Sequence, residues 1–246
     1  MDILLTNDDG FGSIGIVALE KALMEKGHSV YVIAPDKQRS ASSHSVDFRA
    51  PSRMKAFDER HFASEGSPAD CILSGIARNP EPPVHPDLVI SGINKGLNAS
   101  TDIFYSGTCS AAKEAVISGY RAIAISAESS DAFPETSRKA ASFLAENLSS
   151  IAGSIEEGAF ININVPESTD GRTWEIGSLS YFEHRDPERP EDRYFMAGHI
   201  DENRVDGYRT DLCLCANGVI SITPISVSPA LSSRSCSALG NQARKS

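Results

Sequence analysis

Two adjacent carboxylates near the start of the chain stand directly before a glycine-rich stretch. Asp8 and Asp9 precede residues 10–15 (GFGSIG), which match the dinucleotide-binding pattern G-x-G-x-x-G. The glycines alone would favour a backbone cradle for a pyrophosphate. The carboxylates would place negative charge where that pyrophosphate lies. The two signals therefore predict different chemistry.

The dinucleotide interpretation is weakened by the residues between the first apolar run and the glycines. In that fingerprint the first glycine follows the strand at once, whereas Asn7, Asp8 and Asp9 intervene here. Two unit charges about 4 Å apart repel by about 4 kcal/mol at an effective dielectric constant of about 20. Asp36, after the second apolar run, does stand where a ribose-binding acid would stand. A nicotinamide-dependent oxidoreductase therefore stays as an alternative.

A hard divalent cation explains the carboxylates better. Adjacent carboxylates in one site raise one of their pKa values, and a cation such as Mg²⁺ removes this conflict because it prefers oxygen ligands. The competing structural interpretation is a surface turn, in which aspartate is favoured for its local hydrogen bonds. The neighbouring loops decide between the two interpretations.

The elements that must position these residues can be predicted from hydrophobic periodicity. Residues 3–5 are typical of a strand buried on both faces, residues 13–26 have helical spacing that ends at Gly27, and residues 30–34 form a second strand ended by Pro35. This is a βαβ unit. The apolar residues that repeat along its helix are Ile16, Val17, Leu19, Leu23 and Met24.

The same alternation continues to about residue 166. We expect, in order, a helix beginning at Ser67-Pro68, a strand at 87–91, a helix at 108–119, a strand at 121–126, a helix at 135–151 and a strand at 159–165. Such alternation predicts an α/β fold with a doubly wound, mostly parallel sheet.

Ligands of a doubly wound sheet bind beyond the carboxyl ends of its strands. Four polar loops are expected to meet there, at residues 6–10, 35–45, 92–102 and 105–108, and all but the second contain glycine. Beside the two aspartates, these loops offer neutral oxygens that suit Mg²⁺. They are the hydroxyls of Ser40 and Ser42 and the amides of Asn94 and Asn98.

Other residues of these loops have a structural interpretation beside a functional one. Ser106 or Thr108, at the start of a helix, either caps that helix or helps its N-terminus to receive a phosphate. Arg39 either clamps a phosphate or pairs with Asp36. His44 is either a structural residue or a general acid.

Composition bounds the class of protein. The chain has 246 residues, of which 40% are hydrophobic, and a net charge of −10. An acidic chain argues against binding to nucleic-acid polymers. No apolar segment reaches the roughly 18 residues of a membrane helix, and residues 1–3 lack the basic start of a secretory leader. The five cysteines (Cys71, Cys109, Cys213, Cys215 and Cys236) lack paired zinc-site spacing. We therefore expect free thiols, a cytoplasmic location and no membrane partner.

The character of the chain changes after about residue 167. We expect a single domain over residues 1–246, with a core at 1–166, an extended hairpin or small subdomain at 167–217 and a returning strand and tail at 218–246. The end of the tail is expected to be disordered. Residues 210–217 (TDLCLCAN) are interpreted as a strand, although a Cys-rich one.

Six blocks of the sequence resemble the survival protein E (SurE) family in order and approximate spacing. They are ILLTNDDGFGSIGI, VIAPDKQRSASSHS, GSPADCI, LVISGINKGLN, IFYSGTCSAAKEA and GVISITPI, which run from residue 3 to residue 225. The resemblance implies a Rossmann-like sheet whose C-terminal excursion is used to assemble a homodimer or homotetramer. It also implies one divalent metal ion per subunit, Mg²⁺ or Mn²⁺. The implied metal ligands are Asp8, Asp9, Ser40 and Asn94, and the implied phosphate-holding residues are Asn98, Ser106, Gly107 and Thr108.

The implied activity is metal-assisted hydrolysis of nucleoside 5′-monophosphates, and also of 3′-monophosphates and polyphosphate. Two routes stay open: a water attacks phosphorus, or Asp8 or Asp9 attacks it to give an aspartyl-phosphate. The alternative from another class is a non-catalytic nucleotide-binding or regulatory module on the same fold. An intact set of ligands favours the enzyme.

Overall fold

The computed structural model describes residues 1–50, 52–77, 84–180, 204–205 and 207–227. Within these ranges the chain forms a nine-stranded sheet in the order β3-β4-β2-β1-β5-β6-β7-β11-β8. Its strands are β1 (Asp2–Thr6), β2 (Ser29–Pro35), β3 (Met54–Ala56), β4 (His61–Ser64), β5 (Leu88–Lys95), β6 (Ala122–Ala127), β7 (Ala159–Val165), β8 (Trp174–Ile176) and β11 (Ile220–Ser226). The six central strands from β4 to β7 are parallel, which confirms the predicted α/β, doubly wound fold.

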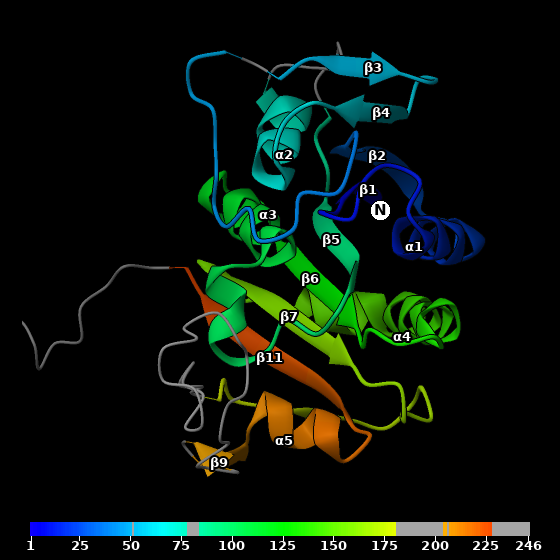
Figure 1. Cartoon of the computed structure of the whole chain (residues 1–246), viewed down its shortest axis with the longest axis vertical. Helices are drawn as coiled ribbons and strands as arrows, with labels where there is room; N and C mark the ends of the chain where they lie inside the picture. The colour runs from blue at the N-terminus through cyan, green and yellow to red at the C-terminus, as the bar shows by residue number, and fades with distance from the viewer. Residues whose placement is uncertain (51, 78–83, 181–203, 206, 228–246) are drawn as a thin grey trace, which may run out of the picture.

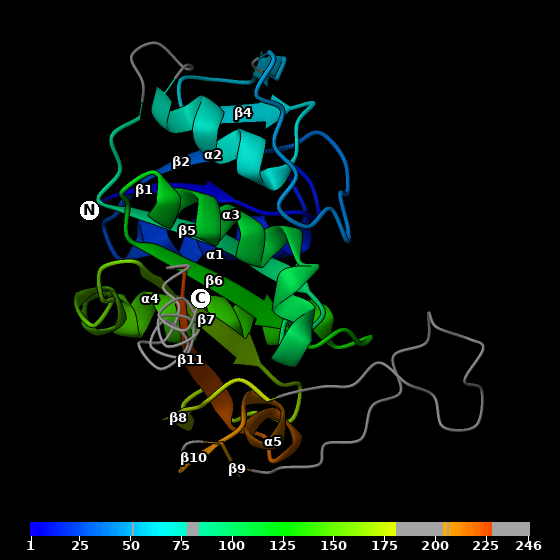
Figure 2. The same ribbon diagram turned by 90° about the vertical axis from the view of Figure 1, so that its left-hand side faces the viewer.

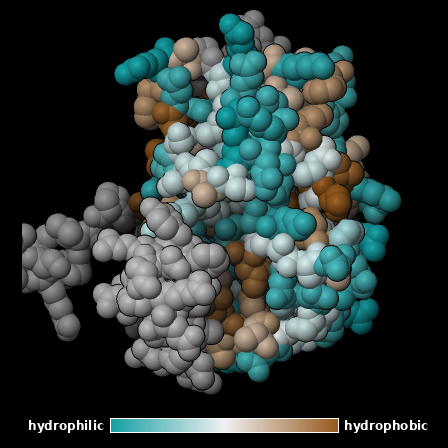
Figure 3. All heavy atoms as spheres, in the orientation of Figure 1, coloured by the Kyte–Doolittle hydropathy of each residue, from teal (hydrophilic) through white to brown (hydrophobic). Residues whose placement is uncertain are grey.

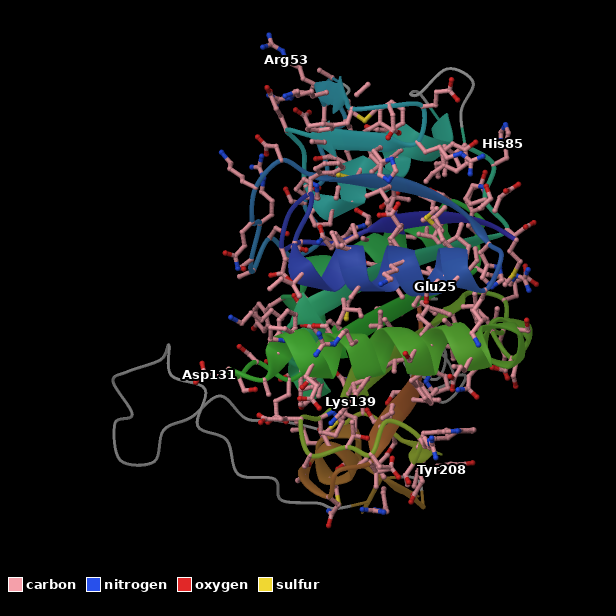
Figure 4. The ribbon with its side chains drawn as sticks, turned by 90° about the vertical axis from the view of Figure 1, so that its right-hand side faces the viewer. Glu25, Arg53, His85, Asp131, Lys139 and Tyr208 are labelled. Carbon is pink, nitrogen blue, oxygen red and sulfur yellow. The ribbon has the colours of Figure 1, made fainter. Side chains whose placement is uncertain are left out.

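Helices cover both faces of this sheet (Figure 1). The helices are α1 (Ile14–Glu25), α2 (Pro68–Ala77), α3 (Gly107–Ile117), α4 (Phe133–Gly153) and α5 (Asp211–Ala216), with a 3₁₀ helix, η1 (Ser100–Phe104). One hydrophobic core lies under α1 and α4, which run side by side in Figure 4, and a second lies under α2 and α3. A short ribbon of β9 (Arg204–Val205) and β10 (Tyr208–Arg209) lies apart from the main sheet.

The first βαβ unit shows how the sequence builds this scaffold. Gly10 and Gly12 have φ of +102° and +78°, so the chain turns between β1 and α1 in conformations that favour glycine. A Cβ atom on Gly15 would lie 2.0 Å from the carbonyl oxygen of Ile93. Gly15 therefore lets α1 pack directly on β5, and the three glycines serve turning and packing.

Helix α2 begins as its sequence predicts. Ser67 Oγ accepts a hydrogen bond from Asp70 N, and the Asp70 carboxylate accepts one from Ser67 N. These reciprocal bonds satisfy two backbone donors at the helix start, and Pro68 occupies the first turn, where its missing N–H is not needed.

The structure corrects three expectations. Residues 210–217 are not a strand: Thr210 caps a helix, α5, by accepting a hydrogen bond from Cys213 N. Val17 and Met24 of α1 do not face the hydrophobic core, since Val17 is 51% exposed and Met24 is 57% exposed. Strands β3 and β4, which extend the sheet at one edge, were not anticipated.

Two strands of the C-terminal part, β8 and β11, join the main sheet, whereas β9 and β10 form the separate ribbon. Strand β11 pairs antiparallel with β7, and β8 pairs parallel with β11. The proposed boundaries at residues 166 and 217 stay a prediction. Residues 181–203 and 206 of the expected excursion, the tail from residue 228 and Cys236 lie outside the described residues. The other four cysteines are free thiols.

No helix in the described ranges combines the length and apolar character needed to cross a membrane.

Candidate active site

The loops at the carboxyl ends of the parallel strands meet on one side of the molecule, to the right in Figure 2 and toward the viewer in Figure 1. Three hydrogen bonds join them to the two aspartates. Arg39 N donates to the Asp8 carbonyl oxygen over 2.7 Å, Lys95 N donates to Asp9 Oδ2 over 2.8 Å, and Thr108 Oγ1 donates to Asp8 Oδ1 over 2.7 Å. Each of the other three predicted loops therefore touches the first. Figure 3 shows hydrophilic side chains gathered over the centre of this side.

Asp8 is a buried carboxylate at the centre of this meeting point. Burial raises its pKa to about 6, and the negative charge of Asp9 adds to the effect, while the hydrogen bond from Thr108 opposes it. Burial also raises the pKa of Asp9, against the hydrogen bond from Lys95 N. No lysine or arginine in the described ranges forms an ion pair with either side chain. Lys95 is the positive charge that acts on Asp9, and it opposes the effect of burial on the pKa of that carboxyl. A buried and a partly buried carboxylate next to each other are chemically suited to a divalent cation.

The start of α3 packs directly against Asp8. A Cβ atom on Gly107 would lie 3.0 Å from Asp8 Oδ2 and 2.8 Å from Ser42 Oγ, so only glycine fits this space without a shift. The Ser42 hydroxyl is buried and has no hydrogen-bond partner in the described part of the chain. An orphaned hydroxyl close to the Asp8 carboxylate and the start of α3 is a polar group that a bound ligand can satisfy.

Ser106 and Thr108, which the sequence offers as a helix cap or a phosphate-binding residue, make different hydrogen bonds. Ser106 is the N-cap of α3, since its Oγ accepts a hydrogen bond from Cys109 N over 3.0 Å. Thr108 instead turns its hydroxyl to Asp8. The capping interpretation therefore holds for Ser106. The backbone N–H of Thr108 also donates to Asp8, so the first turn of α3 holds this carboxylate through two groups of Thr108.

Asn94 lies near the end of β5, next to Lys95, and Ser40 lies in the loop after β2, next to Arg39. Asn94 Nδ2 donates to the Gly96 carbonyl oxygen over 2.7 Å, which leaves Oδ1 as the atom suited to bind a cation. Ser40 is exposed and follows Arg39, whose N–H binds Asp8; its Oγ accepts a hydrogen bond from Gln38 Nε2. Two carboxylates, an amide oxygen and a hydroxyl make an all-oxygen set, which suits Mg²⁺ or Mn²⁺ rather than zinc. No cluster of three or more His, Cys, Asp or Glu among the described residues could hold a metal.

Asn98 is held by a buried polar network that sequence reasoning missed. Its carbonyl oxygen accepts hydrogen bonds from Asn162 Nδ2 and Asn164 Nδ2, and its N–H donates to Asn164 Oδ1. Its own Nδ2 donates to Ser126 Oγ over 2.8 Å. Two asparagines on one buried strand, in FININV, were the signal for this network, because buried amides require partners.

His44 and Arg39 have partners outside the aspartate cluster. His44 Nε2 lies 2.6 Å from Oε2 of Glu114, a buried residue of α3. Arg39 binds Asp36 Oδ1 at 3.2 Å and also the carbonyl oxygen of Glu65. Of the two interpretations of Arg39, the structure shows the ion pair with Asp36.

Comparisons with known proteins identify the family. Residues 3–184 match the sequence family described as Survival protein SurE. The chain belongs to the SurE family. A SurE relative from Caldanaerobacter subterraneus subsp. tengcongensis, named 5'-nucleotidase SurE, is 41% identical over 239 residues, covering 91% of this chain and 90% of that protein. A protein of the same name from Thermoanaerobacter sp. (strain X514) is 42% identical over 242 residues, covering 92% of each chain.

A solved SurE structure has the same fold. The crystal structure of the SurE protein from Aquifex aeolicus superposes with a TM-score of 0.77 at 30% identity, covering 94% of this chain and 95% of that one. The similarity therefore extends over the whole SurE sheet, including its C-terminal part.

Proposed function

We propose that this SurE-family chain is an enzyme, a 5′-nucleotidase that hydrolyses the phosphate monoester of nucleoside 5′-monophosphates with one divalent metal ion. The observation that carries the proposal is the junction of Asp8 and Asp9 with the N-terminus of α3, where Gly107 leaves no room for a Cβ atom. Carboxylates suit a cation, and a helix N-terminus suits a phosphate. The relatives named 5'-nucleotidase SurE support the choice of substrate.

The proposed metal ligands are Asp8, Asp9, Ser40 and Asn94. Their all-oxygen chemistry, the buried like charges of the aspartates and the orphaned Ser42 hydroxyl support a bound Mg²⁺ or Mn²⁺. When bound, such an ion supplies a counter-charge for the phosphoryl oxygens and lowers the pKa of water.

Residues of the chain would bind and orient the phosphate. The start of α3, where Gly107 and Thr108 follow the N-cap Ser106, would face the phosphate, and Asn98 would orient it from the neighbouring loop. The Thr108 hydroxyl fixes the rotamer of Asp8. Because Asp8 Oδ1 already accepts this bond and both aspartates serve as ligands, we favour attack by water over formation of an aspartyl-phosphate. We extend the proposal to 3′-monophosphates and polyphosphate as further substrates.

The test measures phosphate release from AMP and from an artificial aryl phosphate by purified protein. Release is expected with Mn²⁺ or Mg²⁺ and should stop with a chelator; activity that a chelator leaves unchanged would contradict the metal. Asp9→Asn should lower kcat by orders of magnitude. Asp170→Asn is the matched control, because among the described residues Asp170 accepts hydrogen bonds from Arg172 and Thr173 alone.

Calorimetric measurement of ligand binding distinguishes the proposed enzyme from two alternatives, a non-catalytic module and an oxidoreductase. Binding of AMP with Mn²⁺ but no turnover would indicate a non-catalytic nucleotide-binding module. Binding of NAD without metal would indicate an oxidoreductase. We also propose that the enzyme is a homodimer or homotetramer assembled through its C-terminal part, which light scattering of the full chain tests directly.

A further inference from the structure

The segment that joins the two proposed phosphate-holding groups begins in a strained conformation. Asn98 lies at one end of this segment and Ser106 at the other, with η1 between them. Ser100, the first residue of η1, has φ of +55°, which is uncommon for a residue that is not glycine. Such a conformation persists only where the surrounding structure holds it. The groups that hold Ser100 in this conformation therefore affect the positions of Asn98 and Ser106.

The restraint comes from α5, far away in sequence. Asp211, the first residue of α5, is completely buried, and its Oδ2 accepts a hydrogen bond from Ser100 N over 2.7 Å. Asp211 Oδ1 accepts from Ser180 N over 3.0 Å and from Ser180 Oγ over 2.6 Å. Ser100 Oγ closes the ring by donating to the Ser180 carbonyl oxygen over 2.9 Å. In Figure 2, α5 lies next to the segment that leads into α3.

We propose that Asp211 is a positioning residue for the phosphate-binding segment, acting through Ser100. The inference rests on the proposed function. In the described part of the chain, Asp211 forms no hydrogen bond with Asp8, Asp9, Ser40 or Asn94. Its effect reaches the site through the backbone at residue 100, to which it is directly bonded. The β7 asparagines fix Asn98 from one side of the sheet, and Asp211 fixes the next turn of the chain from α5. The C-terminal part of the protein thereby sets the geometry of the catalytic loops.

A purely structural role has to be distinguished from this one. Asp211 also accepts a hydrogen bond from Leu212 N at the start of α5, so it contributes to that helix in any case. A structural residue changes the melting temperature of the protein but leaves the kcat of the folded fraction unchanged. A positioning residue lowers kcat in a folded protein with unaltered metal affinity, because small displacements of bound groups slow the reaction.

The experiment compares wild type, Asp211→Asn and the control Asp170→Asn, which makes the same chemical change at a carboxylate that binds only Arg172 and Thr173. Asn supplies one acceptor oxygen where Asp211 uses two, so at least one bond to Ser100 or Ser180 must break. We expect kcat for AMP and for p-nitrophenyl phosphate to fall about tenfold to hundredfold. Binding of inorganic phosphate with Mn²⁺ should weaken about tenfold, while Mn²⁺ affinity stays within about twofold of wild type.

A second variant tests the backbone conformation itself. Glycine adopts φ near +55° without steric strain, so Ser100→Gly in the Asp211→Asn background should recover part of the lost kcat. Should Asp211→Asn fail to fold, Ser180→Ala takes its place, since it removes only the hydroxyl donor to Asp211, and it should lower kcat about threefold.

Two results would overturn the proposal: a folded Asp211→Asn enzyme with wild-type kcat and phosphate affinity, or a loss of kcat that the double variant only deepens. Wild-type protein that releases no phosphate would instead refute the proposed function. In that case the binding of inorganic phosphate still decides whether Asp211 positions the segment.

Discussion

The hydroxyl of Thr108 donates to the carboxylate of Asp8 over 2.7 Å, joining two buried residues that are 100 positions apart in the sequence. Asp8 follows β1, and Thr108 lies in the first turn of α3. The bond therefore links the proposed metal loop to the proposed phosphate loop, and it selects which oxygen of Asp8 remains for a cation.

Replacing Thr108 tests this link. Thr108→Val keeps the shape of the side chain but removes the donor, and hydrogen bonds to charged groups contribute about 1.5–3 kcal/mol. We expect kcat for AMP to fall about tenfold to hundredfold, whereas Thr108→Ser, which retains the hydroxyl, should stay within a few-fold of wild type. Equal kinetics for the Val and Ser variants would show that the bond does not orient Asp8.

Asp8 should reduce the stability of the metal-free protein at neutral pH. Burial raises its pKa from 3.8 to about 6, so the folded state binds this proton more tightly than the unfolded state. The free energy of unfolding therefore falls by roughly 3 kcal/mol as the pH rises from about 4 to above 6. Asp8→Asn removes this titration. With chelator present, the variant should melt higher than wild type at pH 7.5 and lose that advantage near pH 4, while it has no phosphatase activity.

The control for that pH dependence is Asp170, whose pKa is shifted the other way. Hydrogen bonds from the backbone of Thr173 and Arg172 lower its pKa to about 2. Its contribution to stability is present above its unfolded pKa and is lost only as the pH falls toward 2. Asp170→Asn should therefore not melt higher than wild type at pH 7.5. A gain from both substitutions would point to a general effect of net charge.

Gly15 should tolerate no side chain. A Cβ atom there would lie 2.0 Å from the Ile93 carbonyl oxygen, so Gly15→Ala must push α1 away from β5. We expect the free energy of unfolding to fall by roughly 3 kcal/mol, as is found for overpacked cores. Gly153→Ala, in a helix with nothing near its Cβ position, is the control and should be neutral or stabilising by up to about 1 kcal/mol. Urea unfolding of both variants measures the difference.

The βαβ periodicity was sufficient to predict the central sheet and the edge at which its loops meet. Strands β1, β2 and β5 contain short apolar runs, and helices α1 and α2 have a stop or a cap that can be read locally, as Gly27 and Ser67 show. Strands β3 and β4 were missed because each is only three or four residues long and lacks such a run. Residues 210–217 were misread since a short apolar run has no distinct period; the Thr210 cap was the better signal.

The site was harder to predict where a residue's role depends on distant partners. Adjacent loops could be expected to meet, and Asp8, Asp9, Gly107 and Thr108 do lie together. The hydrogen bonds to the backbone of Asn98 come from Asn162 and Asn164, which are more than 60 positions away. The two asparagines indicate that buried amides need partners, but no local pattern names Asn98 as the partner.

The pairing of His44 with Glu114 leads to a fourth prediction. Because Nε2 lies 2.6 Å from a buried carboxylate, we expect His44 to anchor its loop to α3 rather than to protonate a leaving group. His44→Gln keeps a donor for Glu114 and should retain most of kcat with an unchanged pH–rate profile. His44→Ala leaves Glu114 unpaired and should lower stability by about 1–3 kcal/mol. Loss of one limb of the pH profile in the Gln variant would restore the general-acid interpretation.

The position of β11 between β7 and β8 has a consequence for folding during synthesis. Every proposed ligand has left the ribosome once residue 108 is exposed, yet the edge of β7 stays open until residues 220–226 follow. During that interval a nascent chain presents an unpaired, apolar strand to its neighbours, which is a known route to aggregation. A chain truncated before residue 220 would keep all of the proposed chemical groups and remain permanently in that vulnerable state.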